Sequence, residues 1–80
     1  MYFVYILKSL RDEGYYIGQT YSLELRIEKH NKGQVHSTRS RIPFVLIKKE
    51  VFDTRGEVRK RENYLKKLKG GNEFKKIISF

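Results

Sequence analysis

The chain has 80 residues, of which 39% are hydrophobic and 14% aromatic, so we expect one folded domain over residues 1–80 rather than two domains or a disordered basic tail. Its 18 basic residues against 9 acidic ones give a net charge of +9, which favours a polyanionic partner, most commonly nucleic acid, over a basic surface that is merely solvated. There is no cysteine, which excludes disulfides and thiolate metal sites.

The start of the chain predicts an antiparallel hairpin. Residues 2–7 are rich in aromatic and β-branched side chains and indicate a first strand, and residues 15–19 indicate a second. Between them, residues 10–14 end in Asp-Glu-Gly, which is typical of a turn. The apolar first residues have no basic segment before them and are too few to cross a bilayer, so we expect a cytoplasmic protein with no membrane partner.

A first helix is predicted over residues 23–32. Ser22 is of a type that caps helix amides, and Gly33 stands in the usual helix-stop position. One face of this helix carries the residues at i, i+3, i+4 and i+7, namely Leu23, Arg26, Ile27 and His30. Because two of these four residues are apolar, we expect this face to pack against the core. A guanidinium and an imidazole are uncommon on such a face. The two polar side chains therefore lie either at the rim of the core or in a site.

The second half of the chain predicts a loop, a strand and two helices. Residues 34–43 are polar and basic, which indicates an exposed loop, and residues 44–52 indicate a third strand. Thr54, followed three residues later by a glutamate, matches a capping box, so a second helix is expected over residues 55–69. Asn72 can cap a last short helix. The resulting order, β-β-α-β-α-α, belongs to the α+β class.

The second helix also places a charged residue on its apolar face, because its continuous stripe consists of Val58, Glu62, Leu65 and Leu68. Taken alone, Glu62 is expected to lean off the stripe and pair with Lys66 at i+4, which is a common helix contact. However, both helices carry ionisable side chains on inward faces. If the two helices pack on one sheet, Arg26, His30 and Glu62 converge on a shared pocket.

Tyrosines and one glycine add to this set. The predicted hairpin carries Tyr2, Tyr5, Tyr15 and Tyr16, most of which are expected to pack in the sheet, while one or two turn a hydroxyl into the same cleft. Gly18 weakens a strand unless another group comes close to the backbone there, so we place it in the same site. Together, a tyrosine, an arginine, a histidine and one carboxylate suit phosphodiester cleavage. The carboxylate can anchor Mg²⁺, the arginine can bind phosphate oxygens, and a phenol can accept a proton from water with help from the histidine.

In this order, the residues resemble the GIY-YIG nuclease family over nearly the whole chain. Tyr16-Ile17-Gly18 is an intact YIG triplet, and Phe3-Val4-Tyr5 stands in place of GIY, keeping only its tyrosine. Residues 23–30 look like the family's first helix with its arginine and histidine, and Arg61-Glu62-Asn63 looks like its Arg-Glu segment. Asn72 stands where many members place a further active-site asparagine. The chain is most similar to the short standalone members and is also similar to the N-terminal incision domain of the excision-repair nuclease UvrC.

This resemblance implies a small three-stranded antiparallel sheet flanked by helices, and a metal-dependent hydrolysis of DNA in repair or recombination. It implies that Glu62 holds Mg²⁺ or Mn²⁺ and that Arg26 stabilises the transition state. It also implies that a tyrosine is the general base, which we assign to Tyr5, with Tyr16 or His30 assisting.

Substrate binding is then expected to rest on basic residues outside the catalytic set, which are Arg39 and Arg41 of the loop and Lys66 and Lys67 of the second helix. DNA is expected as the partner rather than RNA, and a separate protein can supply targeting. Two alternatives stay open at this point. One is a non-catalytic module that binds nucleic acid on the same fold, and the other is an interaction domain for an acidic protein, which explains only the charge.

Overall fold

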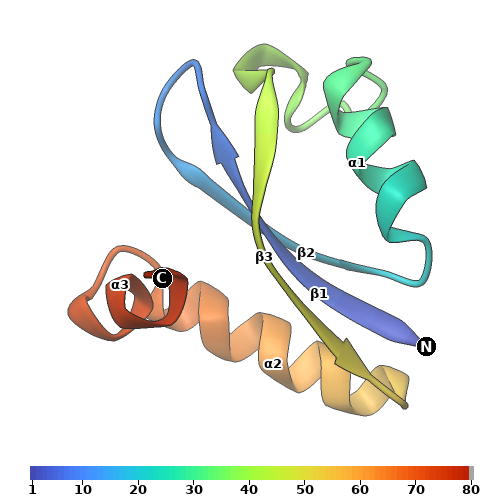
Figure 1. Cartoon of the computed structure of the whole chain (residues 1–80), viewed down its shortest axis with the longest axis vertical. Coiled ribbons are helices and arrows are strands. Elements are labelled where there is room, and N and C mark those ends of the chain that lie inside the picture. Colours follow the sequence, from blue (N-terminus) through green and yellow to red (C-terminus); the bar gives the residue numbers. More distant parts are fainter. Residues whose placement is uncertain (80) are drawn as a thin grey trace.

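The computed structural model describes residues 1–79. Its elements follow in the order β1 Tyr2–Ser9, β2 Tyr15–Thr20, α1 Leu23–Asn31, a 3-10 helix Arg39–Arg41, β3 Phe44–Phe52, α2 Arg55–Leu68 and α3 Asn72–Ile78 (Figure 1). The predicted β-β-α-β-α-α order and the α+β class are therefore confirmed. The short 3-10 helix is an addition that the sequence did not predict.

The three strands form one antiparallel sheet in the order β2-β1-β3, as the resemblance implies. Successive side chains of a strand point to opposite faces of the sheet. Along β1, Val4 and Ile6 pack into one core, and Tyr5 and Leu7 pack into another. In the register with β2, Tyr5 lies opposite Gly18. This pairing positions the site described below.

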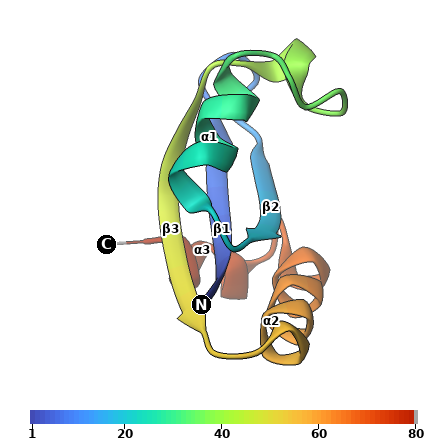
Figure 2. The same cartoon turned by 90° about the vertical axis from the view of Figure 1, so that its right-hand side faces the viewer.

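The helices cover both faces of this sheet. Helices α2 and α3 lie on one face and α1 lies on the other (Figure 1, Figure 2). The core beneath α2 and α3 consists of Val4, Ile6, Ile17, Val58, Leu65 and Phe74. The core beneath α1 consists of Tyr5, Leu7, Leu23 and Phe44. The sheet is therefore the middle of three layers, and each side chain of its central strand faces either α1 or α2.

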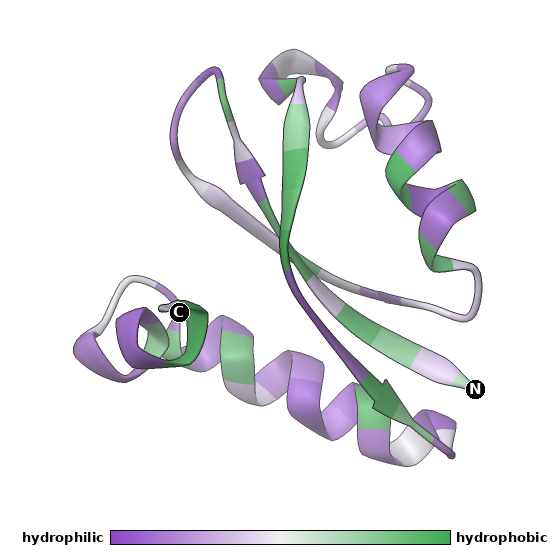
Figure 3. Cartoon of the chain, viewed as in Figure 1, coloured by the Kyte–Doolittle hydropathy of each residue, from purple (hydrophilic) through white to green (hydrophobic). Residues whose placement is uncertain are grey.

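Each of the two longer helices has one apolar face. Figure 3 shows hydrophilic and hydrophobic residues alternating at short intervals along α1 and α2, as expected for helices that are half exposed to water. Helix α1 buries Leu23 and His30, and α2 buries Val58, Glu62 and Leu65. Each helix thus buries one ionisable residue of its apolar face, while Arg26, on the same face of α1 as His30, is half-buried. No helix within residues 1–79 has the length and apolar character that a membrane crossing requires.

The predicted helix cap is confirmed at Thr54, confirmed in position but not in bonding at Ser22, and wrong at Asn72. The Thr54 hydroxyl accepts a hydrogen bond from the Glu57 amide at 3.2 Å, which is the predicted cap, and donates to the Glu57 carboxylate at 2.9 Å, whereas the full capping box would use the Thr54 amide for this second bond. Ser22 occupies the cap position of α1, but its side chain makes no capping bond. Asn72 does not cap α3, because Gly71 holds the cap position and Asn72 is already the first helical residue. The residue type shows which side chains are able to cap a helix. The backbone angles at that position decide whether the side chain forms the capping hydrogen bond.

The segment predicted as an exposed loop is partly buried. It contains the 3-10 helix Arg39–Arg41, and Thr38 is only 1% exposed. Two contacts draw it inward: the Thr38 hydroxyl meets the side chain of His30 at 2.8 Å, and the Ser9 hydroxyl donates to the backbone carbonyl of Arg41 at 2.6 Å. The prediction of an exposed loop rested on the polar composition of the segment. It is wrong in part because some of these polar groups form hydrogen bonds with other buried groups and not with water.

Candidate active site

The phenol of Tyr5 lies directly over Gly18 in the neighbouring strand. A Cβ atom at Gly18 would stand 2.5 Å from the Tyr5 hydroxyl oxygen and 2.6 Å from Cζ, distances that real side chains do not tolerate. Both residues are buried. The close approach predicted at Gly18 is therefore found, and the approaching group is the hydroxyl end of Tyr5.

The Tyr5 hydroxyl meets His30, which extends from α1 onto the same face of the sheet. The two side chains form a hydrogen bond of 3.1 Å between the tyrosine oxygen and Nε2 of the imidazole. Three aromatic rings surround His30 edge-on, those of Tyr5, Tyr16 and Phe44, with centroid distances of 5.9, 4.9 and 5.8 Å. His30 is 0% exposed. It is thus a fully buried imidazole held in one orientation by packing and hydrogen bonds.

Burial sets the protonation of this pair. It raises the pKa of Tyr5 well above its ordinary value, Tyr16 raises it further, and the Arg26 guanidinium lowers it without offsetting the burial. Burial also lowers the pKa of His30, and the positive charge of Arg26 lowers it again. Both groups are therefore neutral near pH 7. A neutral imidazole beside a neutral phenol can accept the phenolic proton.

Glu62 lies on α2, on the opposite face of the sheet from His30. Its carboxylate accepts a hydrogen bond of 2.6 Å from the Gln19 side-chain amide and forms an ion pair of 3.0 Å with Lys66. The predicted pairing with Lys66 is thus present, yet Glu62 points inward and is only 9% exposed. Gln19 was not predicted as a site residue, although the alternation that places Ile17 beneath α2 places Gln19 there as well.

Arg26 and Glu62 reach the same region from opposite faces, around edge strand β2. Arg26 lines two adjoining hollows of about 100 and 190 Å³, both of which also include Thr20 and Tyr21. The larger of the two extends to Gln19, the hydrogen-bond partner of Glu62. The negative charge of Glu62 contributes to the raised pKa of Tyr5. The two helices lie on opposite faces of the sheet, so Arg26 and Glu62 approach this edge from its two sides.

The remaining predicted residues lie outside this cluster. The guanidinium of Arg41 is held by Asp12 of the β1–β2 turn at 2.6 Å and lies over the ring of Phe44. Arg39 and Lys67 are exposed. Asn72 is exposed in the first turn of α3. Arg41 therefore ties the loop to the hairpin.

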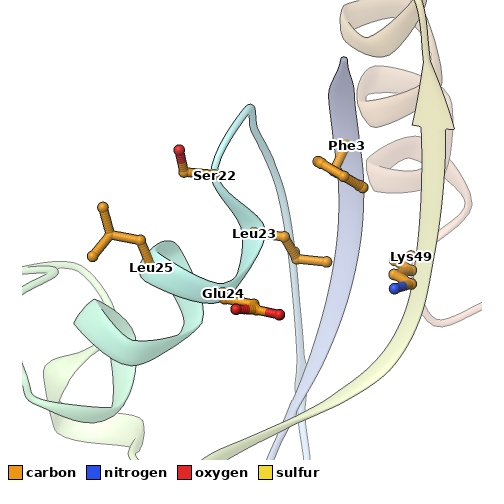
Figure 4. Close-up of a pocket in the computed structure, with 6 residues that line it drawn as sticks. All are labelled: Phe3, Ser22, Leu23, Glu24, Leu25 and Lys49. Atoms are coloured by element: carbon orange, nitrogen blue, oxygen red, sulfur yellow. The ribbon is translucent and has the colours of Figure 1, made fainter.

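A separate hollow of about 430 Å³ lies between the start of α1 and the strands. Figure 4 shows its lining side chains, which are Phe3, Ser22, Leu23, Glu24, Leu25 and Lys49. None of these residues belongs to the candidate catalytic set. Its size alone therefore does not make this hollow the active site.

The donor set around Glu62 fits one hard divalent cation. Within residues 1–79, no three His, Cys, Asp or Glu side chains gather where they can hold a metal ion together. Mg²⁺ does not need such a cage, since it keeps several waters and binds through one or two carboxylates and the phosphates of its substrate. One Glu62 oxygen is paired with Lys66, whose side chain is 54% exposed and free to move away. Glu62 is therefore the residue able to hold such an ion.

Comparisons with known proteins identify the family of this chain. The sequence model described as the GIY-YIG catalytic domain matches residues 1–76. A UPF0213 protein of Clostridium perfringens is 42% identical over 99% of this chain and 85% of its own length. A UPF0213 protein of Staphylococcus saprophyticus is 38% identical over 95% of this chain and 93% of its own length. No solved structure gives a significant match. On the extent of the domain match and of these relatives, the chain belongs to the GIY-YIG family, a family of nuclease type.

Proposed function

We propose that this protein is a metal-dependent nuclease that hydrolyses phosphodiester bonds in DNA. The observation that carries the proposal is the hydrogen bond of 3.1 Å between Tyr5 and His30, with the Arg26 guanidinium close enough to lower the pKa of Tyr5. A pair of proton-accepting groups beside a phosphate-binding cation is what hydrolysis of a phosphodiester requires. The family match and the net charge of +9 give independent support.

The scissile phosphate is proposed to enter through the two hollows beside Thr20 and Tyr21. Arg26 lines both of them, and its planar guanidinium fits two non-bridging phosphate oxygens. There it opposes the negative charge that develops on these oxygens in the transition state. Arg55, which lines the larger hollow, adds a second positive charge on the side of α2.

Tyr5 is proposed to take a proton from the attacking water. Because its pKa is raised, it is neutral before the reaction, so it accepts a proton only as it passes its own to His30. The water oxygen then bonds to phosphorus while the bond from phosphorus to the leaving oxygen breaks. Tyr16 packs edge-on against His30 at 4.9 Å, which suits a role in holding the imidazole.

Glu62 would hold the divalent cation, Mg²⁺ or Mn²⁺. When bound, an ion of this kind neutralises negative charge on the leaving oxygen. Gln19 would keep the carboxylate in orientation through its bond to one oxygen. Lys66 would give up its ion pair with the other oxygen.

The proposed substrate is DNA in the nicked or branched forms that arise in repair and recombination. Exposed basic side chains such as Arg39 and Lys67 give affinity through phosphate contacts and carry little sequence information. An additional protein that directs the nuclease to its substrates would supply the missing selectivity. These statements rest on charge and on the family, so the experiment compares nucleic acids of several structures.

The test is cleavage of single-stranded, nicked and branched DNA, and of RNA of the same sequence, with Mg²⁺, Mn²⁺ or EDTA. We expect cleavage of DNA that requires a metal. Glu62→Gln and Arg26→Lys are expected to abolish cleavage while DNA binding persists. Glu73→Gln and Arg59→Lys make the same chemical changes at exposed positions and are expected to cleave normally.

Each other outcome has a definite meaning. DNA binding with no cleavage in any metal would identify a non-catalytic nucleic-acid-binding module and end the proposal. Normal cleavage by Glu62→Gln would remove Glu62 from metal binding, and normal cleavage by Arg26→Lys would remove the requirement for a planar guanidinium.

A further inference from the structure

A continuous line of buried polar groups runs from Tyr5 to the loop after α1. The Tyr5 hydroxyl contacts Nε2 of His30 at 3.1 Å, and Nδ1 of His30 contacts the Thr38 hydroxyl at 2.8 Å. The Thr38 hydroxyl in turn lies 3.4 Å from the carbonyl oxygen of Val35. Tyr5, His30 and Thr38 are exposed by 1%, 0% and 1%. These three side chains have almost no contact with bulk solvent, so the hydrogen bonds among them set where their protons lie.

The chain of contacts has a definite direction. The Val35 carbonyl accepts hydrogen bonds only, so the Thr38 hydroxyl donates to it and is left to accept from His30 Nδ1–H. At the other end, the Tyr5 hydroxyl lies 3.1 Å from Nε2 of His30 and can donate its proton to a lone pair there. The Thr38 end therefore requires the neutral imidazole with its proton on Nδ1, and this form leaves a lone pair on Nε2 that faces the Tyr5 hydroxyl.

We propose that Thr38 is a positioning residue that holds His30 in the Nδ1–H tautomer and thereby makes Nε2 the acceptor of the Tyr5 proton. This inference rests on the nuclease function proposed above. As water gives a proton to the Tyr5 oxygen, the phenolic proton passes to Nε2 and the imidazole becomes positively charged. Thr38 stabilises that charge by accepting from Nδ1–H. With the other tautomer, Nε2–H would point at the phenol and the transfer would be blocked.

Nothing in the sequence marks Thr38 for this role. It lies in a polar segment between Ser37 and Arg39, and its spacing from His30 belongs to no helix or strand. Only the 3-10 helix that follows it, over Arg39–Arg41, brings its hydroxyl beneath α1. The other hydroxyls of the segment, those of Ser37 and Ser40, are on exposed residues and serve as matched controls.

The first experiment reads the tautomer without DNA or metal. Protein labelled with ¹⁵N-histidine has two imidazoles, His30 and the exposed His36, and two-bond ¹H–¹⁵N correlation spectra show which nitrogen of each is protonated. We expect the Nδ1–H form at His30 in the wild type and in Thr38→Ser. We expect loss of that form in Thr38→Val, which keeps the shape but lacks the hydroxyl, with His36 unchanged. An Nε2–H form in the wild type, or no change in Thr38→Val, would overturn the inference.

The second experiment asks what the tautomer does for the reaction. We expect Thr38→Val to reduce kcat by about 10- to 100-fold with an unchanged KM, and Thr38→Ser and Ser37→Ala to cleave like the wild type. Thermal unfolding of each variant identifies a loss of folding, in which case the wild-type and Thr38→Ser spectra decide the tautomer. Normal kcat in a Thr38→Val protein whose tautomer has changed would overturn the role in proton transfer.

The two failures are distinguishable. A wild-type protein that cleaves nothing ends the nuclease proposal and with it the catalytic role of Thr38, whereas the spectra still decide the hydrogen-bond direction. A wild-type protein that cleaves DNA with the Nε2–H tautomer leaves the nuclease proposal intact and removes only Thr38 from it.

Discussion

Replacing Gly18 by alanine is expected to damage both stability and activity by displacing Tyr5. The new Cβ would lie 2.5 Å from the Tyr5 hydroxyl oxygen and 3.1 Å from the ring of Tyr16. Ordinary contact begins at about 3.4 Å, so the phenol has to retreat by roughly 0.9 Å. Tyr5 is 1% exposed and lies on the central strand, so it has little room to retreat.

The magnitude follows from the packing. Adding a methyl group to a filled core costs about 1–3 kcal/mol, which for a domain of this size lowers the Tm by roughly 5–20 °C. A retreating phenol also loses its bond of 3.1 Å to His30. If Tyr5 and His30 move the proton together, cleavage should fall by about 100-fold or more.

The assay pairs thermal unfolding with cleavage and uses a second glycine as control. Gly56 lies in the first turn of α2, and apart from its chain neighbours and the nearby helix backbone no atom of residues 1–79 lies within 4 Å of the place that an alanine methyl would take there, so Gly56→Ala is expected to keep or raise the Tm. In a Tyr5→Leu background the obstruction is removed, and Gly18→Ala should then cost far less. Equal Tm values for Gly18→Ala and Gly56→Ala would refute the reasoning.

Three further predictions concern the remaining contacts. Arg41→Ala should raise the pKa of Asp12 from about 2 toward its ordinary 3.8 in an NMR titration. Because the folded-state pKa is lowered, the pair stabilises the fold above about pH 4 and ceases to do so as the pH falls toward 2, so the Tm difference between Arg41→Ala and wild type should shrink in acid to what the contact with Phe44 contributes. Arg39→Ala should weaken DNA binding and reduce the slope of log affinity against log salt by about one; an unchanged slope would remove the loop from the DNA surface. Thr54→Ala should lower the free energy of unfolding by about 1 kcal/mol in urea, with Thr54→Ser restoring it, and wild-type stability in Thr54→Ala would contradict the cap.

Local patterns predicted most of the fold. The alternation of β1, the apolar stripes of both helices and the capping box at Thr54 depend on neighbours a few residues away, which the sequence displays directly. Gly18 stands out because a glycine inside a strand needs a reason. The family resemblance then joined Tyr5 to residues far along the chain, which local patterns cannot do.

The parts that escaped prediction depend on distant partners. Thr38 is buried because its hydroxyl bonds to the His30 imidazole, and Gln19 matters because α2 brings Glu62 against it at 2.6 Å. The placement of α1 and α2 on opposite faces follows from the path of the whole chain through the sheet. Neither composition nor spacing within a single element contains that information.

The hairpin register links the chemistry of the site to a turn that lies away from it. If β1 slipped by one residue against its neighbours, Val4 or Ile6 would replace Tyr5 beneath α1, and the phenol would face the wrong helix. The turn opposes such slippage through a bond of 2.8 Å from the Ser9 amide to Gly14 and through the Asp12 side chain, which accepts from the Gly14 amide at 2.8 Å. The β1–β2 turn therefore sets the alignment of the strands. Small insertions or deletions in this turn would abolish the proposed activity without changing any residue that takes part in the reaction.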